Sequence, residues 1–303
     1  MEKKLIVAKN IGFCFGVNRT VSIAKSLLEK YKTLYSIGDI VHNPIVMEEL
    51  KIKGLKVTDN LKEIKRCPFI VRSHGIGQKI LERLKQQQVD IYDATCPSLK
   101  KLQALIKKLD KEKYFVIIIG NKQHPEVKAL KDYAKHALVV QEGIECKNIK
   151  LFEKLAVIGQ TTLSFKDYLK TTGYILGKLC FKQIVIYNTI CKVTEERQVE
   201  SAEISKKSDM VIVMGGKTSS NTAKLYQNCR MFNKNVHHIE KMEELDRISL
   251  NGIYSIGLIS GTSTPENFIL SVKDRLKDKG YKEVKINGKR RSKQTSGRKN
   301  RKF

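Results

Sequence analysis

Short apolar runs alternate along the chain with longer amphipathic stretches. The short runs are rich in β-branched residues and end in small or polar residues, a pattern typical of buried strands. They lie at Leu5–Ala8, Thr33–Ile37, Phe69–Arg72, Asp90–Ala94, Tyr114–Ile119, Ala137–Val140, Leu155–Ile158, Gln183–Tyr187, Met210–Met214, Asn235–Ile239 and Tyr254–Ile259.

Between these runs, apolar residues recur three and four positions apart, with Lys and Glu on the opposite face. Such helical stretches include Arg19–Tyr31, Gln78–Gln87, Leu99–Lys111, Phe165–Leu179 and Val193–Lys207. Strands that alternate with helices predict an α/β protein with mostly parallel sheets.

Three of the expected strand-to-helix corners each carry one cysteine, namely Cys14, Cys96 and Cys191. Their nearly equal separations favour three similar α/β units around one centre, although chance placement among seven cysteines would look the same. We expect units at 14–97, 98–190 and 191–287, the last completed by a strand within 1–13. No Pro/Gly-rich linker separates them, so close packing is expected.

Composition supports a folded chain. The 303 residues are 41% apolar, enough for two or three packing units. Lys and Arg number 58 against 31 Asp and Glu, a net charge of +27 that excludes an acidic, disordered protein. Residues 288–303 hold eight basic residues and no acid, which predicts a disordered tail. Nucleic-acid contact through this tail is the less favoured alternative.

The longest apolar runs fall far short of the roughly 18 residues that span a bilayer. The start, Met-Glu-Lys-Lys, does not fit a signal peptide. We therefore expect a soluble, cytoplasmic protein with no membrane partner. Seven cysteines without a Cys-x-x-Cys pair favour free thiols or metal ligands over disulfides.

Polar residues gather where the expected strands end, which is where α/β proteins place their sites. The segments are His42–Asn43, Ser73–Gly75, His124–Val127, Gln160–Ser164, Gly215–Thr222 and Ser260–Glu266. The last two carry runs of hydroxyl residues, which favour anion binding over simple helix capping. A nucleotide P-loop is excluded because Val211 stands where that motif needs Gly.

Histidines recur at these corners. His42, His74 and His124 lie just past strands, and His237 or His238 less securely so. Such imidazoles could bind a diphosphate, supply protons or ligate a metal. Nearby, Glu126 could relay protons, or could be an ordinary acid of a first helical turn.

The corner cysteines offer soft ligands. Three thiolates without a fourth suit an iron–sulfur cluster with one open iron, and a three-Cys-one-His zinc site is the rival. We expect lowered thiol pKa values for Cys14 and Cys96 because they begin helices. The other four cysteines are interpreted as packing residues or idle thiols: Cys67, Cys146, Cys180 and Cys229.

Nine segments in order, from about Lys4 to Ile286, resemble the 4-hydroxy-3-methylbut-2-enyl diphosphate reductase family of the non-mevalonate isoprenoid pathway. They are Gly12–Val17, His42–Asn43, Ser73–Gly75, Asp93–Pro97, His124–Val127, Gln160–Ser164, Thr189–Gln198, Gly215–Thr222 and Ser263–Glu266. Val193 and Gly261-Thr262 are mild departures from the family pattern, and we expect neither to touch a proposed ligand. The basic tail lies outside the resemblance.

The resemblance implies three α/β units around a central cleft and one 4Fe–4S cluster per subunit, held by Cys14, Cys96 and Cys191. The implied reaction is reductive dehydroxylation of (E)-4-hydroxy-3-methylbut-2-enyl diphosphate to isopentenyl and dimethylallyl diphosphates, with reduced ferredoxin or flavodoxin as electron donor. By the same resemblance, Glu126 delivers protons and Thr161 lies beside the substrate hydroxymethyl. The diphosphate pocket would comprise His42, His74, His124, Ser219, Ser220, Asn221 and Ser263.

Two other classes make different predictions. An RNA-associated protein should interleave aromatic with basic residues, yet aromatics are only 7% and Trp is absent. A zinc-dependent hydrolase using the same cysteines and histidines should be colourless and stable in air, whereas a cluster enzyme should be brown and bleach.

Overall fold

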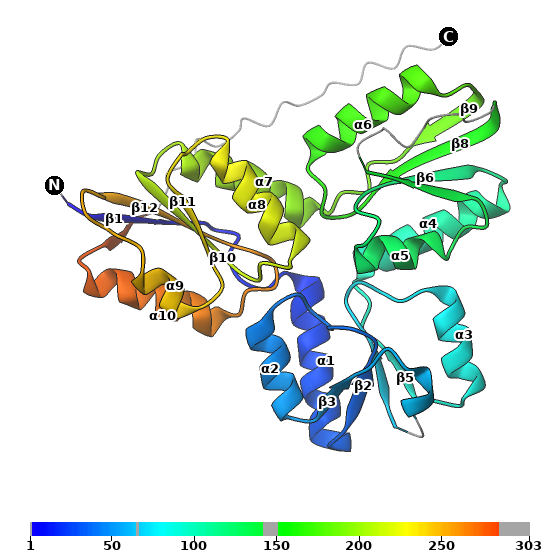
Figure 1. Cartoon of the computed structure of the whole chain (residues 1–303), viewed down its shortest axis with the longest axis horizontal. Coiled ribbons are helices and arrows are strands. Elements are labelled where there is room, and N and C mark those ends of the chain that lie inside the picture. The colour runs from blue at the N-terminus through cyan, green and yellow to red at the C-terminus, as the bar shows by residue number, and fades with distance from the viewer. Residues whose placement is uncertain (1, 65–66, 142–150, 285–303) are drawn as a thin grey trace, which may run out of the picture.

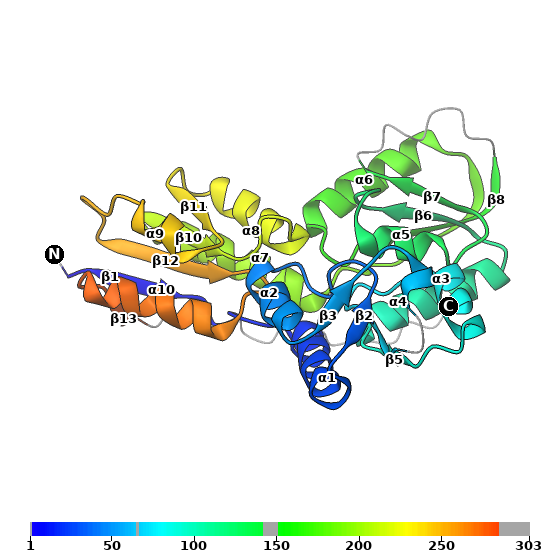
Figure 2. The same ribbon diagram turned by 60° about the horizontal axis from the view of Figure 1, so that its bottom comes forward.

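The computed structural model describes residues 2–64, 67–141 and 151–284. They form three lobes, each built on its own parallel sheet, which meet at one centre (Figures 1 and 2). The expected α/β class with three similar units is confirmed. The basic tail 288–303 and Cys146 lie outside the described residues.

The first lobe contains a sheet of order β3-β2-β4-β5. Its elements are α1 (Phe15–Tyr31), β2 (Leu34–Ser36), α2 (Pro44–Ile52), β3 (Leu55–Val57), the 3-10 turn η1 (Leu61–Glu63), β4 (Phe69–Val71), α3 (Gln78–Gln86) and β5 (Ile91–Asp93).

The second lobe contains a sheet of order β7-β6-β8-β9. Its elements are α4 (Pro97–Lys111), β6 (Phe115–Ile119), α5 (Pro125–Lys131), β7 (Ala137–Val140), β8 (Phe152–Gly159), α6 (Phe165–Lys178) and β9 (Phe181–Ile186).

The third lobe has the order β11-β10-β12-β1-β13 and therefore includes the N-terminal strand. Its elements are β1 (Lys4–Val7), α7 (Lys192–Ser205), β10 (Met210–Met214), α8 (Ser220–Arg230), β11 (Val236–Ile239), α9 (Met242–Asp246), β12 (Ser255–Ser260), α10 (Glu266–Asp278) and β13 (Lys282–Val284).

One topology is used three times. If the N-terminal strand β1 is left aside, the first and third strands of each lobe along the chain are neighbours in the sheet, and the second lies outside the first. The fourth position is taken by β5, by β9 and, in the third lobe, by β1. Every pair of neighbouring strands in the described structure is parallel. The carboxyl ends of the strands in each sheet therefore lie along one edge of that sheet.

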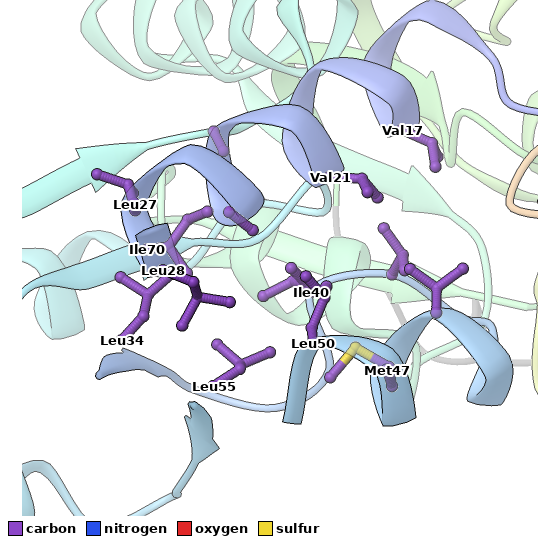
Figure 3. Packing of buried hydrophobic residues seen from close by; sticks show 14 residues of the cluster. Val17, Val21, Leu27, Leu28, Leu34, Ile40, Met47, Leu50, Leu55 and Ile70 are labelled. Atoms are coloured by element: carbon purple, nitrogen blue, oxygen red, sulfur yellow. The ribbon is translucent and has the colours of Figure 1, made fainter. Parts of the chain in front are cut away.

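Helices on both faces of each sheet explain why the strands read as continuous apolar runs. All five residues of β10 are buried. In the first lobe, Val21 and Leu28 of α1 pack with Leu50 of α2 and Ile70 of β4 (Figure 3). Among the described residues, no helix is long and apolar enough to cross a membrane.

The eleven expected strands are all present, and two more are found. The missed strands, β3 and β13, are three-residue edge strands that contain Lys or Glu, so they lack an apolar run. Two expectations are wrong. His42 does not lie just past a strand, because β2 ends at Ser36, and His237 and His238 lie inside β11 rather than beyond its end.

Replacing Ile117 by Ala should destabilise the protein by about 2–5 kcal/mol, because this fully buried residue of central strand β6 leaves a cavity. The matched control is Ile52→Ala, at a position that is 81% exposed, where the change should stay within about 0.5 kcal/mol. Urea unfolding followed by circular dichroism measures both, and equal losses would refute this assignment of the core.

Candidate active site

The three corner cysteines are held in the same way in the three lobes. Each one is the N-cap residue of a helix: α1, α4 or α7. Each backbone N–H donates to the carbonyl of the corner that follows the neighbouring strand. The pairs are Cys14 to Thr262 (3.0 Å), Cys96 to Ser73 (3.0 Å) and Cys191 to Thr161 (2.9 Å).

The thiols of Cys96 and Cys191 are near enough to Cys14 to act on it electrostatically. A Cβ added at Gly16 would lie 2.6 Å from Cys96 Sγ, so only glycine lets the start of α1 approach Cys96 this closely. The Cys14 sulfur accepts the Val17 N–H at 3.5 Å. Desolvation by burial raises the pKa of the Cys14 thiol, and the nearby thiols of Cys96 and Cys191 act in the same direction. The expected lowering at Cys14 is therefore wrong, because burial outweighs the Val17 N–H bond.

The distances between the sulfurs determine whether they could bind a single metal ion. Within the described part of the chain, the three cysteines do not form a group whose ligand atoms all lie within 4.8 Å of one another. A single zinc ion bound at about 2.3 Å would need sulfurs about 3.8 Å apart. In the described structure, the three sulfurs are therefore not grouped tightly enough to bind one zinc ion.

Next to the sulfurs, His42, His74 and His124 converge from three different corners. Their ring centroids lie 4.3 Å apart for His42 and His74, and 5.5 and 5.6 Å from His124 to these two. One ring nitrogen from each lies within 4.8 Å of the others. The three rings can therefore contact one small group together.

Burial is the first cause that lowers the pKa of each of these histidines. The pKa of His124 falls to about 3, with His42 and Arg72 adding to the effect of burial. Burial, the other two imidazoles and Arg72 hold the pKa of His74 well below 6.5. The pKa of His42 is lowered by burial and by Arg72, against the opposing charge of Asp39. All three imidazoles are thus neutral at pH 7.

A small polar pocket of about 40 Å³ lies among these rings. Its lining is Val17, Val41, His42, His74, His124, Thr162, Ser219, Ser220, Asn221, Thr262 and Ser263. Several buried polar atoms have no hydrogen-bond partner among the described residues: His42 Nε2, both amide atoms of Asn221 and Thr222 Oγ1. Since buried polar groups are normally paired, these atoms mark a place for a polar ligand.

Helix starts surround this pocket. Asn43 and Ser219 are the N-cap residues of α2 and α8, and His124 caps α5. First-turn N–H groups and the positive end of a helix dipole attract anions. Hydroxyls, imidazoles and these helix starts together suit an anionic ligand.

Glu126 is the only buried carboxylate among the described residues, and it contacts Thr161 twice. Its two oxygens accept the N–H and the hydroxyl of Thr161, both at 2.7 Å. Burial raises the pKa of Glu126, although the Thr161 hydrogen bonds lower it. A carboxyl that holds its proton more tightly than usual is suited to donate it through the Thr161 hydroxyl.

A groove of about 870 Å³ adjoins the pocket and shares His124, Ser219 and Ser220 with it. It runs between α6 of the second lobe and α8 of the third (Figure 1). The hydroxyl of Ser220, which lines both groove and pocket, lies 3.0 Å from the hydroxyl of Thr162, which lines the pocket.

The structure brings the predicted site residues together. His42, His74, His124, Ser219, Ser220, Asn221 and Ser263 line the pocket, and Glu126 and Thr161 contact each other beside it. Val17 and Thr262 connect pocket and sulfurs, since both line the pocket and both bind Cys14 through the backbone.

Sequence reasoning missed Thr162 and Thr262 in the pocket, and Arg72, whose charge acts on all three histidines. Its position directly before the Ser73-His74 corner is the sequence feature that could have identified Arg72. Of the remaining cysteines, Cys67 is half-buried, Cys180 is exposed and Cys229 is buried in the core of the third lobe.

Comparison with known proteins gives one consistent result. A family described as LytB protein matches residues 5–277. The 4-hydroxy-3-methylbut-2-enyl diphosphate reductase of Caldanaerobacter subterraneus subsp. tengcongensis is 39% identical over 280 residues, covering 90% of this chain and 96% of the relative. That of Dictyoglomus turgidum is 38% identical over 275 residues, with the same coverage.

Two solved structures share the fold. The E-1-hydroxy-2-methyl-but-2-enyl-4-diphosphate reductase from Plasmodium falciparum has a TM-score of 0.86 and 27% identity, covering 97% of this chain and 95% of that one. A second structure, of (E)-4-hydroxy-3-methyl-but-2-enyl diphosphate reductase, the terminal enzyme of the non-mevalonate pathway, has a TM-score of 0.67 and 33% identity, covering 91% and 99%.

The buried histidines should make the protein less stable in acid. A base whose pKa is lowered by folding binds its proton more readily in the unfolded chain, so stability falls as the pH drops below about 6.5. For His124, the loss between pH 7.5 and 5.5 is about 1.4 kcal/mol. Glu126, whose pKa is raised, acts in the opposite direction.

His124→Asn removes this contribution while keeping a side chain that can cap α5. Its unfolding free energy should therefore fall by about 1.4 kcal/mol less than that of the wild type over this range. Urea titrations at both pH values measure the difference, with exposed His136→Asn as the control. An equal acid loss in His124→Asn and wild type would rule out this role of the buried ring.

Proposed function

Because the chain belongs to the LytB family of 4-hydroxy-3-methylbut-2-enyl diphosphate reductases, we propose that the corner cysteines and the adjoining pocket form its active site. The protein is an oxidoreductase of isoprenoid biosynthesis and acts at the last step of the non-mevalonate pathway. Two electrons and two protons convert the allylic alcohol diphosphate to isopentenyl and dimethylallyl diphosphates, and water leaves.

One observation carries the assignment of the site. The thiols of Cys14, Cys96 and Cys191, one from each lobe, are near enough to act on one another electrostatically, and the adjoining pocket holds buried polar atoms of His42 and Asn221 without a partner among the described residues. A reductase of an allylic diphosphate needs both parts: a place for electron transfer and a socket for phosphate oxygens. If either the cysteines or the pocket were displaced, the source of electrons would no longer lie next to the bound substrate.

We propose a 4Fe–4S cluster, one per subunit, on Cys14, Cys96 and Cys191. Three soft thiols that act on one another electrostatically, but are not grouped tightly enough for a single ion among the described residues, suit this cofactor. When bound, such a cluster supplies electrons and, at an iron without a cysteine, a Lewis acid. The protein then contributes orientation, exclusion of water and protons.

The diphosphate is assigned to the polar pocket. A buried multiply charged anion is expensive unless most of its oxygens receive hydrogen bonds. His42, His74, His124, Ser219, Ser220, Asn221 and Ser263 supply these donors, together with the starts of α2 and α8. Asn221 fits the role because its amide has no partner in the folded chain.

Glu126 is assigned the proton supply, acting through Thr161. Its carboxyl is buried, has a raised pKa and binds the Thr161 hydroxyl at 2.7 Å. A proton on Glu126 can pass to Thr161 as the hydroxyl of Thr161 gives its own proton to the departing oxygen. In this arrangement the carboxyl of Glu126 stays outside the pocket, and the hydroxyl of Thr161 is the proton donor at the edge of the pocket.

The electrons are assigned to reduced ferredoxin or flavodoxin, and the protein to the cytoplasm. Carriers of this kind deliver single electrons and work in the reducing compartment in which free thiols persist. This assignment rests on the family resemblance, and the tail 288–303 plays no part in it.

Iron and acid-labile sulfide should be present after anaerobic purification and should depend on the corner cysteines. We expect Cys14→Ala, Cys96→Ala and Cys191→Ala each to lose most of the iron, because two thiolates hold a cluster poorly. Cys180→Ala, at an exposed position, should keep wild-type iron and colour. A colourless wild-type protein containing zinc would overturn the cluster assignment.

Glu126→Gln should bind substrate with nearly wild-type affinity and lose about 10²- to 10⁴-fold in kcat, the usual contribution of a positioned general acid. Turnover with a chemical reductant, together with substrate binding by calorimetry, separates the two effects. Glu153→Gln, at an exposed surface position, is the control. Undiminished turnover in Glu126→Gln would contradict the proton role.

A further inference from the structure

Arg197 is the only lysine or arginine buried among the described residues, in a protein that carries 58 of them. It is 4% exposed and lies in α7, less than two turns after Cys191. Removing a cation from water costs several kcal/mol unless an opposite charge compensates it. The position of Arg197 therefore requires an explanation.

The hydrogen bonds of Arg197 do not provide that charge. Its guanidinium donates to the carbonyls of Ser260 at 2.9 Å and Gly12 at 2.7 Å, and its Nε has no partner among the described residues. Glu200 lies one turn further along α7, but its carboxylate accepts the N–H groups of Lys9 and Asn10. Within the described chain, Arg197 forms no ion pair.

Three groups act electrostatically on this charge: the thiol of Cys14, then the carboxylate of Glu200, then the thiol of Cys191. Glu200 forms no ion pair with Arg197 among the described residues, because its oxygens accept the N–H groups of Lys9 and Asn10. The same guanidinium holds Gly12, two residues before Cys14, against the helix that begins at Cys191. It therefore controls both the position and the electrostatic surroundings of two sulfurs.

We infer that Arg197 is a positioning residue of the cysteine site: it fixes Cys14 relative to Cys191 and compensates the negative charge that the thiolates carry when the cluster is bound. This inference rests on the proposed function. A fixed buried cation favours the state with more negative charge, so it also raises the reduction potential of the bound group. A thiolate partner supplied only when the cluster is bound also explains why Arg197 forms no ion pair among the described residues.

The test separates charge from structural clamping. Arg197→Gln keeps an amide donor and removes the charge, whereas Arg197→Lys keeps the charge. We expect one-electron reduction of anaerobically purified Arg197→Gln holoenzyme to become at least tenfold less favourable, a fall of 59 mV or more in midpoint potential. Arg197→Lys should stay within threefold of the wild type.

The control is Lys192→Gln. Lys192 directly follows Cys191 but its side chain is 88% exposed, so water screens its charge and the potential should not move. Redox titration followed by electron paramagnetic resonance gives the potentials. Circular dichroism and iron content show whether each variant is folded and loaded.

Each outcome of this experiment either supports the inference or overturns it. A folded, iron-free Arg197→Gln beside a loaded Arg197→Lys also supports the inference, because the charge is then needed to retain the cluster. A loaded Arg197→Gln with wild-type potential overturns it, as does loss of iron from both variants. An unfolded Arg197→Gln overturns it too, since the residue would then serve folding in general. Absence of iron from the wild type would instead refute the proposed function.

Discussion

The active site depends on one repeated hydrogen bond. In each lobe the N–H of a corner cysteine donates to the carbonyl of the corner after the adjacent strand. Those acceptors, Ser73, Thr161 and Thr262, directly precede or belong to the residues assigned to the substrate. Because parallel pairing fixes where neighbouring strands end, strand register determines the position of sulfur relative to pocket in all three lobes. A slip in any one sheet would separate a cysteine from its share of the pocket.

Much of this arrangement could be predicted from the sequence. Buried parallel strands are continuous apolar runs, so eleven strands are evident, and polar residues at their ends identify the corners that hold the cysteines and histidines. Two strands were missed because β3 and β13 are short edges with charged residues. His237 and His238 were misplaced because a polar pair within a strand looks like a corner when pairing is unknown; in the fold, β10 pairs with them.

Burial could not be predicted in the same way. Arg197 lies in a helix with four glutamates, where an arginine would be expected to be exposed, and only the packing of α7 against Gly12 and Ser260 shows that it is buried. The pKa of the Cys14 thiol had the wrong expected direction for the same reason. A helix start lowers a thiol pKa, but desolvation, which depends on tertiary contacts, outweighs it.

The centre of the molecule is poor in charge, although the chain carries a net charge of +27. Among the described residues, burial lowers the pKa of the three imidazoles and raises that of the one buried carboxyl, while the one buried cation acts on the thiols of Cys14 and Cys191. Burial therefore favours the neutral forms of all four titratable groups, and Arg197 is the one charge that the centre holds without an ion pair. An anion beside the imidazoles has the opposite effect from burial. A neighbouring negative charge raises the histidine pKa and so favours protonation of the imidazoles. The surface lysines then attract the substrate from a distance, while recognition at close range depends on neutral donors that gain charge only when the phosphate arrives.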